Sequence, residues 1–373
     1  MPALSTADHS VSPPRIDVPR TYNAACDLLE RNLEAGRGGK LAYIDDGGRY
    51  TYAELAARVN RAANALTELG LRPEQRVVLA LHDTIDFPAV FLGAIKAGIV
   101  PIAVNTLLTA NDYRYILSDS RAAALVVSAP LLSTFEEAMQ GGGRIFVKEV
   151  IVSGAAETRY RRLAELLRAA GDTCEAAAMT ADDPCFYLYS SGSTGAPKGT
   201  VHVHASMIQT AELYARPVLG IREDDVVFSA AKLFFAYGLG NSLSFPLAVG
   251  ATTVLMAERP TPAAVFKRLT EHRPTIFYGV PTLFAAMLAA PDFPAREALN
   301  LRRCASAGEP LPPEIGRRFR ERTGIDILDG IGSSEMLHIF LSNRADDVLE
   351  QSVEVARHVP GRMDTQRRQV PAR

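Results

Sequence analysis

The pattern of apolar and polar positions predicts an amphipathic helix early in the chain. Thr51 to Glu54 has the sequence of a capping box, in which the first and fourth residues cap the start of a helix reciprocally. Apolar residues then recur at helical spacing from Leu55 to Leu69, and Gly70 supplies a stop signal. This segment is therefore expected to be a helix with one buried face.

Beyond this helix, short apolar runs alternate with helical patterns. The predicted strands are Val77–Leu81, Ile99–Val104, Leu125–Val127, Glu149–Val152, Phe186–Tyr189, Val226–Ser229, Thr252–Met256, Ile276–Gly279, Arg303–Ser306 and Ile327–Asp329. The predicted helices cover about residues 86–97, 203–215, 262–272, 281–290 and 312–323, and the Ala-rich region 153–181 is expected to hold a helix and a linker. Strand–helix–strand order favours parallel pairing through right-handed crossovers. The chain is therefore expected to have an α/β fold with buried sheets.

The two ends of the chain differ from this pattern. Residues 1–20 are rich in Ser and Pro and have no apolar core, which predicts a disordered tail. From Val348 to the C-terminus there is no aromatic residue and no sustained periodicity, and five arginines fall in the final 23 residues. We therefore expect one ordered domain over residues 21–345 and a disordered tail, outside the family domain, over residues 346–373.

Charge and cysteine usage exclude several classes of function. The chain has 40 basic and 42 acidic residues, a net charge of -2, so no basic field favours nucleic acid. The most apolar stretch, Ala89 to Val104, is broken by Lys96 and Pro101 and is too short to span a membrane. Four widely spaced cysteines without a C-x-x-C pair indicate reduced thiols. We expect a cytoplasmic protein without nucleic-acid or membrane partners, and its oligomeric state stays open.

The strongest local signal is the sequence Y-S-S-G-S-T-G-A-P-K-G from Tyr189 to Gly199. Its glycines permit positive φ and close backbone approach, its N–H groups can form an anion-binding nest, and Lys198 adds a cation. The loop follows a predicted strand and precedes a predicted helix. Pro197 and Thr200 stand where a Walker A loop needs its second glycine, and no G-x-S-x-G elbow of a serine hydrolase is present. A flexible Ser/Gly linker is the alternative.

This loop resembles the signature of the AMP-binding, adenylate-forming superfamily of acyl-CoA synthetases, luciferases and peptide-synthetase adenylation domains. The resemblance implies the large N-terminal domain of that fold, with stacked sheets flanked by helices in αβαβα-like layers. It also implies that the loop holds the β- and γ-phosphates of ATP. The residues concerned are Ser190, Ser191, Gly192, Ser193, Thr194, Gly195 and Lys198.

Two further segments resemble nucleotide motifs of the same family. In S-A-G-E-P-L-P, Ala307, Gly308 and Glu309 would border the adenine, although the segment also fits a turn before a helix. In the D-G-I-G-S-S-E segment that starts with Asp329 and Gly330, the resemblance gives Ser334 to the α-phosphate and Glu335 to Mg²⁺. A carboxylate and phosphate oxygens suit Mg²⁺, while the alternative for Glu335 is a carboxylate at a helix N-terminus.

The segment from Lys232 to Asn241 and the following Phe245 would form the acid pocket. Aromatic and small residues dominate this segment, and no Asp or Glu lies between Leu233 and Phe245. Relatives that activate amino acids use an Asp here to hold the substrate ammonium, so its absence disfavours an amino-acid substrate. The sequence of this segment most resembles that of benzoate–CoA ligases, and the resemblance gives Phe235 the position of the aromatic residue that gates the pocket. By this resemblance the residues lining a flat pocket are Ala236, Tyr237, Phe245, Gly332, His338 and Ile339. Ordinary core packing is the alternative for these aromatic residues and for His338, and the H-x-H of His202 and His204 is weak evidence for a metal.

The resemblance runs from about Tyr22 to Asn343. Family members continue with a Gly-rich strand segment, an Asp that binds the ribose, a hinge and a small mobile domain with a catalytic Lys, and none of these follows Asn343. We therefore expect an AMP-binding domain that is incomplete at its C-terminal end, in a truncated or frame-shifted product.

The resemblance implies activation of benzoate or a substituted benzoate by ATP and Mg²⁺ to the acyl-AMP, and then transfer to coenzyme A. Two alternatives stay open. The chain is a weak or inactive remnant that binds only ATP or the aryl acid, or it belongs to another aryl-acid or short-acyl ligase. A P-loop ATPase is disfavoured because the Gly-rich loop lacks the residue spacing of a Walker A motif.

Overall fold

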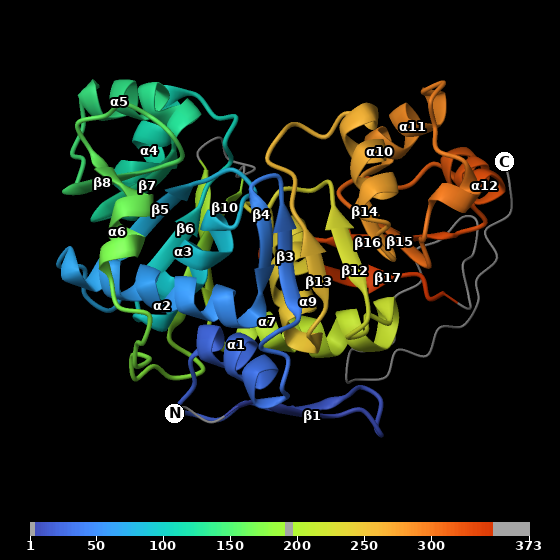
Figure 1. The fold of residues 1–373 in the computed structure, drawn as a ribbon, viewed down its shortest axis with the longest axis horizontal. Coiled ribbons are helices and arrows are strands. Elements are labelled where there is room, and N and C mark those ends of the chain that lie inside the picture. The colour runs from blue at the N-terminus through green and yellow to red at the C-terminus, as the bar shows by residue number, and fades with distance from the viewer. Residues whose placement is uncertain (1–3, 191–196, 346–373) are drawn as a thin grey trace, which may run out of the picture.

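Two large β-sheets form the body of the protein. The computed structural model describes residues 4–190 and 197–345. Figure 1 shows one sheet of blue-green to yellow-green strands, and a second sheet of yellow to red strands with the blue strands β3 (Leu41–Asp45) and β4 (Gly48–Thr51) at one edge. A small two-stranded N-terminal sheet, β1 (Thr6–Asp8) and β2 (Arg15–Asp17), lies beside them. Within the described residues, no helix is both long enough and apolar enough to cross a membrane.

The first sheet has seven strands. In spatial order they are β11 (Lys198–Val203), β10 (Pro184–Ser190), β6 (Val100–Ala103), β5 (Arg76–Ala80), β7 (Ala124–Ser128), β8 (Glu149–Ser153) and β9 (Arg161–Arg162). Every neighbouring pair is parallel except β10 and β11, which are antiparallel. At the connected end of that pair, where β10 ends and β11 begins, Ser190 lies opposite Lys198.

The second sheet has eight strands. In spatial order they are β17 (Ile339–Ser342), β16 (Ile327–Gly332), β15 (Arg303–Ser306), β14 (Ile276–Gly279), β12 (Val226–Ser229), β13 (Thr252–Val254), β3 (Leu41–Asp45) and β4 (Gly48–Thr51). Its centre is parallel, and an antiparallel pair closes each end, β16 with β17 and β3 with β4. The carboxyl ends of the central strands therefore point the same way.

Helices cover both faces of each sheet. On the outer side of the seven-stranded sheet lie α4 (Ala110–Ser120), η1 (Ala129–Leu131) and α5 (Leu132–Gln140). Between the sheets lie α1 (Ala24–Glu34), α2 (Tyr52–Glu68), α3 (Asp86–Lys96), α6 (Leu163–Ala169), α7 (Ala205–Thr210), the π-helical η2 (Ala211–Leu219) and η3 (Gly240–Ser244), α8 (Ala236–Leu239) and α9 (Phe245–Val249). On the outer side of the eight-stranded sheet lie α10 (Pro262–Glu271), α11 (Pro281–Ala289), η4 (Arg296–Ala298) and α12 (Pro313–Thr323).

Side-chain alternation along the strands divides the core between these layers. In β5, Val77 and Leu79 join the cluster between the sheets, whereas Val78 and Ala80 join the outer cluster. In β14, Phe277 faces the other outer layer and its two neighbours face the middle. Both sheets are thus buried on both faces, which explains their continuous apolar runs. The predicted αβαβα-like layers are confirmed.

Most predicted elements have their expected type, and two interpretations need correction. The capping box at Thr51 and Glu54 is formed as predicted. The helix predicted over about residues 203–215 begins only after β11 and continues as the π-helical η2. The Gly-rich loop therefore joins two antiparallel strands and does not run directly into a helix. The region 191–196 lies outside the described residues.

The prediction that residues 1–20 are disordered was wrong for residues 4–20. The β1–β2 hairpin is held to the body by Ser5, whose hydroxyl donates to Asp27 over 2.6 Å. His9 also contacts Glu212 of η2, with 2.7 Å between the His9 Nε2 and a carboxylate oxygen. Low hydrophobicity misled the interpretation because polar contacts to a buried acid anchor this segment. The predicted tail over residues 346–373 lies outside the described residues.

Candidate active site

A cavity of about 820 Å³ opens where strands of both sheets end. Its lining includes Asn105 just after β6, Ala230 after β12, Val280 after β14, Ala307 after β15 and Gly332 at the end of β16. Ligands of open α/β sheets bind at the carboxyl ends of the strands, where loops diverge. The location and size of this cavity fit a small-molecule site.

The cavity brings together segments that lie far apart in the sequence. The predicted site residues in its lining are Phe235, Ala236, Tyr237, Ala307, Gly308, Gly332, Ser334, His338 and Ile339. They come from the acid-pocket segment and from both downstream nucleotide motifs. One continuous space therefore touches the groups predicted for the acid and for the nucleotide.

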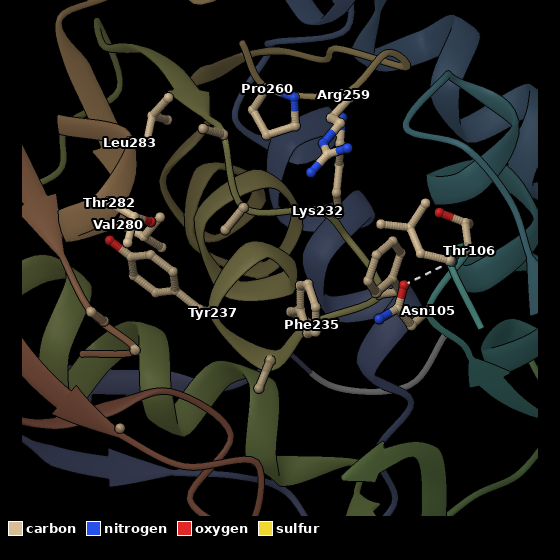
Figure 2. Close-up of a pocket in the computed structure, with 18 of the residues that line it drawn as sticks. Asn105, Thr106, Lys232, Phe235, Tyr237, Arg259, Pro260, Val280, Thr282 and Leu283 are labelled. Carbon is tan, nitrogen blue, oxygen red and sulfur yellow. Dashed lines mark hydrogen bonds between the residues drawn. The ribbon is translucent and has the colours of Figure 1, made fainter. Parts of the chain in front are cut away.

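Two aromatic side chains stand at the centre of the cavity. Phe235 and Tyr237 project from the start of α8, as Figure 2 shows. Phe235 remains 49% exposed, and its ring lies 4.5 Å from that of Phe234. The Tyr237 ring lies 5.3 Å from the His338 ring. A flat, mostly apolar wall of this kind suits an aromatic ring through offset or edge contacts.

His338 is a buried neutral imidazole. Its Nε2–H donates to Oδ1 of Asn241 over 3.0 Å and to the carbonyl of Tyr237 over 3.2 Å. Burial lowers the pKa of His338 to about 3, and the bond to Tyr237 opposes this shift only in part. Its Nδ1 is buried without a hydrogen-bond partner. Because the ring is neutral and already donating through Nε2, Nδ1 is an acceptor at the cavity wall.

Phe245 lies behind this wall and is absent from the cavity lining. Its ring is fully buried and meets the His338 ring edge-on at 4.4 Å. Close backbone approach also fixes the wall, since a Cβ on Gly240 would stand 2.3 Å from Cδ2 of His338. A Cβ on Gly332 would stand 2.7 Å from the carbonyl oxygen of His338. Glycine at both positions lets the helix and the β16–β17 hairpin pack directly on the histidine.

The predicted phosphate loop is carried by the β10–β11 hairpin. Ser190 and Lys198 are paired at the connected end of this hairpin, so a hydroxyl-bearing and a cationic residue stand on either side of the loop sequence. Lys198 is exposed, and the hydroxyl of Tyr189, the residue before Ser190, donates to Asp119 over 2.6 Å. Ser191, Gly192, Ser193, Thr194 and Gly195 lie outside the described residues.

The second and third nucleotide motifs lie side by side because β15 and β16 are parallel neighbours. Ser306 pairs with Asp329, and an Asp329 carboxylate oxygen accepts the backbone N–H of Leu311 over 3.2 Å. Burial raises the pKa of Asp329. Gly308 has a φ of +95° with open space around it, so its backbone offers an uncovered surface on which a flat base fits.

The other predicted residues of these motifs lie around the cavity. Glu309 is exposed beyond Gly308, and Gly330 lies in the β16–β17 ladder opposite Ser342. Ser334 lines the cavity, and the next residue, Glu335, is exposed with no salt bridge to any residue of the described part. A free carboxylate beside phosphate oxygens fits Mg²⁺, which keeps several waters and needs few protein ligands.

Several cavity residues were missed by the sequence interpretation. They are His82, Asn105, Thr106, Lys232 and Arg259, of which Figure 2 labels all but His82. His82 and Asn105 directly follow predicted strands, so the rule that sites form at carboxyl ends of strands could have found them. Lys232 was named only as the first residue of the segment that ends at Asn241, and no role was assigned to it.

Lys232 joins the cavity to a buried carboxylate. Its ammonium donates to the carbonyls of Met256 and Glu258, and burial lowers its pKa. Asp83 is fully buried beside it and accepts the backbone N–H of Leu233 over 3.3 Å. Burial raises the pKa of Asp83 to about 6, while Lys232 opposes that shift. These contacts bind the segment that carries Phe235 to loops of both sheets.

Comparison with known protein families identifies the chain. The family model described as "AMP-binding enzyme" matches residues 29–363. The chain belongs to this family. The match runs past residue 345, the boundary predicted for the family domain, and the family and the α/β fold named from the motifs are confirmed.

Three relatives illustrate how similar this family member is to known proteins. A benzoate–CoA ligase of Thauera aromatica is 64% identical over 93% of this chain and 66% of its own length. A 4-hydroxybenzoate–CoA/benzoate–CoA ligase of Rhodopseudomonas palustris is 49% identical over 87% of this chain and 60% of its own length. A benzoate CoA ligase structure from Burkholderia xenovorans LB400 is 53% identical with a TM-score of 0.84, covering 90% of this chain and 65% of that one. This chain therefore spans less than two thirds of each relative's length.

Proposed function

We propose that this protein activates an aromatic carboxylic acid, benzoate or a substituted benzoate, with ATP and Mg²⁺. The acid carboxylate attacks the α-phosphorus of ATP to give the acyl-AMP and pyrophosphate. Coenzyme A then attacks the acyl carbon, so that the acyl-CoA forms and AMP leaves. We place the reaction in the cytoplasm, because the four cysteines of the protein are expected to stay reduced there.

The observation that carries this proposal is the shared cavity. Its wall at Tyr237 and His338 is aromatic and its lining there has no carboxylate, while Gly308 and Ser334 line the same space. An acid held against the first pair would present its carboxylate toward the nucleotide motifs. Such positioning of two reactants accounts for a large share of the rate enhancement in group transfer. The names of the relatives support an aryl acid.

The described residues suit separate tasks in this reaction. The aromatic wall binds the ring of the acid and excludes water from it. Gly308 offers backbone surface to the adenine, and Lys198 with Ser190 provides a cation and a hydroxyl for phosphate oxygens. Ser334 provides a donor for the α-phosphate, and Glu335 provides a carboxylate for Mg²⁺. Bound Mg²⁺ would neutralise phosphate charge.

Pyrophosphate release by the purified chain tests the proposal. We expect release that requires ATP, Mg²⁺ and benzoate together, and benzoyl-CoA once CoA is added. Octanoate and phenylalanine serve as matched acids that a flat, uncharged pocket should reject. Release with octanoate but not with benzoate would overturn the aryl assignment. Binding of ATP and benzoate without any release would favour a binding protein over an enzyme.

A further inference from the structure

His202 connects the hairpin of the phosphate loop to the turn of the third nucleotide motif. Its Nε2–H donates to the carbonyl of Ser334 over 2.8 Å. The side chain is buried, and its ring stacks on Phe186 with 4.9 Å between centroids and 25° between planes. Stacking on a core ring fixes the plane of the imidazole, so the donor has little freedom to follow a displaced carbonyl.

The Ser334 carbonyl is the centre of a constrained turn. It also accepts the backbone N–H of Leu337 over 3.2 Å, and Leu337 has a φ of 65°. A bulky residue in this left-handed region is unfavourable and persists only where neighbouring contacts impose it. Within the same turn, the Ser333 hydroxyl accepts the N–H of Met336 over 3.2 Å. The bond from His202 reaches this turn from a strand of the other sheet.

Strand geometry places His202 on the nucleotide side of the hairpin. Lys198 and His202 are both in β11, whose pairing with β10 is regular from Ser190, opposite Lys198, to Phe186, opposite His202. Residues four apart in a strand point to the same face. The strand that carries the predicted phosphate cation therefore also carries the group that holds the Ser334 carbonyl.

We propose that His202 is a positioning residue that sets Ser334 and Glu335 in register with the phosphate-loop hairpin. This inference rests on the proposed function, since it assumes that both segments hold Mg-ATP. His202 contacts neither reactant, and it acts through the backbone of Ser334. Its effect should fall on Mg-ATP, which needs both segments at once, and not on the aryl acid.

His204 provides a matched control on the same segment. It is also a buried imidazole, but its Nδ1 accepts the backbone N–H of Ala24 at the start of α1, over 3.1 Å. Each histidine thus makes one hydrogen bond to the backbone, His202 to Ser334 and His204 to Ala24. Replacing either one removes a buried hydrogen bond, yet only one of these bonds reaches the nucleotide turn.

The experiment compares Mg-ATP and benzoate affinities of four variants by calorimetry, together with thermal unfolding. His202→Leu removes the donor, His202→Gln keeps an amide N–H near the position of Nε2, and His202→Asn has an amide too short to reach Ser334. We expect Mg-ATP affinity to fall by about 10–100-fold in His202→Leu and His202→Asn, since loss of a group that positions a metal ligand has effects of this size. His202→Gln should stay within about fivefold of the parent. His204→Leu should lose stability but keep its affinity.

A second measurement separates positioning from general damage. The ratio of ATP affinities with Mg²⁺ and with EDTA should shrink in His202→Leu, because Glu335 no longer meets the metal, while benzoate affinity is kept. Equal ratios in parent and His202→Leu would overturn the inference and leave the proposed function standing. Equal losses in His202→Leu and His204→Leu would also overturn it. If His202→Leu does not fold, the Gln and Asn variants decide by the same criteria. A parent that binds no Mg-ATP would refute the proposed function itself.

Discussion

Nε2 of His338 lies 3.0 Å from Oδ1 of Asn241, a fully buried residue of the π-helical η3. The same amide donates through its Nδ2 to the Ser229 hydroxyl over 3.3 Å. Asn241 therefore links the end of β12 to the histidine at the cavity wall. π-helical turns often mark functional sites, and this one places an amide where an α-helical register would place a different residue.

Replacing Asn241 with Leu should loosen the cavity wall. The His338 N–H would keep only the Tyr237 carbonyl, and the Ser229 hydroxyl would lose a donor. Both groups keep one other partner, so the cost is that of two lost hydrogen bonds, about 0.5–1.5 kcal/mol each. We expect urea unfolding to show a loss of that size, with weaker benzoate binding and unchanged Mg-ATP binding. Unchanged benzoate affinity would show that the amide does not orient the wall.

The strands at the centre of both sheets could be predicted because they are buried on both faces. Val226–Ser229, Ile276–Gly279 and Arg303–Ser306 have the predicted bounds, since a continuous apolar run between polar turns leaves little choice. The hairpin strand β11 was missed because its sequence, with Lys198, Gly199 and His202, lacks apolar alternation. Its partner β10 imposes the strand conformation through pairing that the local sequence does not encode.

Family motifs predicted most of the cavity wall, but not the contacts that hold it. Phe235, Tyr237 and His338 were assigned by resemblance, and all three line the cavity. Asn241 and His202 received no role, because their partners lie 97 and 132 residues away in sequence. Such long-range hydrogen bonds leave no local pattern, and only the folded backbone reveals them.

Acid should destabilise the fold partly through His338. Its pKa is about 3 in the folded protein against an ordinary value of 6.5, so the unfolded state binds a proton first as the pH falls. The stability that the neutral imidazole contributes is complete above pH 6.5 and is lost as the pH falls toward 3. Each pH unit in this window removes about 1 kcal/mol for this group.

Other buried groups also titrate in this window. His204, with a pKa of about 4, acts in the same direction as His338. Asp83, with a pKa raised to about 6, acts in the opposite direction, because its stabilising form is protonated. Urea unfolding of parent and His338→Gln at pH 6.5, 5.5 and 4.5 isolates one group. We expect the variant to lose less stability on acidification than the parent, and parallel curves would contradict a buried neutral imidazole.

Gly240→Ala should disturb the cavity from behind. The new Cβ would meet Cδ2 of His338 at 2.3 Å and Cζ of Phe245 at 3.1 Å, so the ring or the helix must move. Overpacking of this kind costs about 1–3 kcal/mol. Gly39→Ala is the control, since a Cβ there meets nothing within 4 Å. Urea unfolding and benzoate binding should both be impaired only in Gly240→Ala. Equal behaviour of the two variants would mean that the wall adapts freely.

The N-terminal hairpin should depend on Asp27. This fully buried carboxylate accepts the hydroxyls of Ser5 and Tyr22, each over 2.6 Å, and pairs with Arg31. Asp27→Ala removes the ion-pair partner of the half-buried Arg31 and the acceptor of two hydroxyls, and each hydrogen bond to a charged group contributes about 1.5–3 kcal/mol. We expect a lower melting temperature and early proteolysis within the first 20 residues. Asp17→Ala, which removes an exposed carboxylate of β2 that makes no side-chain hydrogen bond or ion pair within the described residues, should change neither.

Glu335→Gln tests the metal role of the third motif. The substitution keeps size and hydrogen-bonding capacity but removes the charge that a hard cation prefers, so affinity for Mg-ATP should fall by about tenfold or more. Affinity for ATP in EDTA should stay the same or rise, because the carboxylate repels the phosphates when no metal separates them. Calorimetry in both buffers measures the two effects, and Glu68→Gln, an exposed carboxylate at the end of α2, provides the charge-matched control. If ATP affinity changes equally with Mg²⁺ and with EDTA, Glu335 acts only through the structure of its turn. Equal Mg-ATP affinity in parent and variant would remove Glu335 from the metal site.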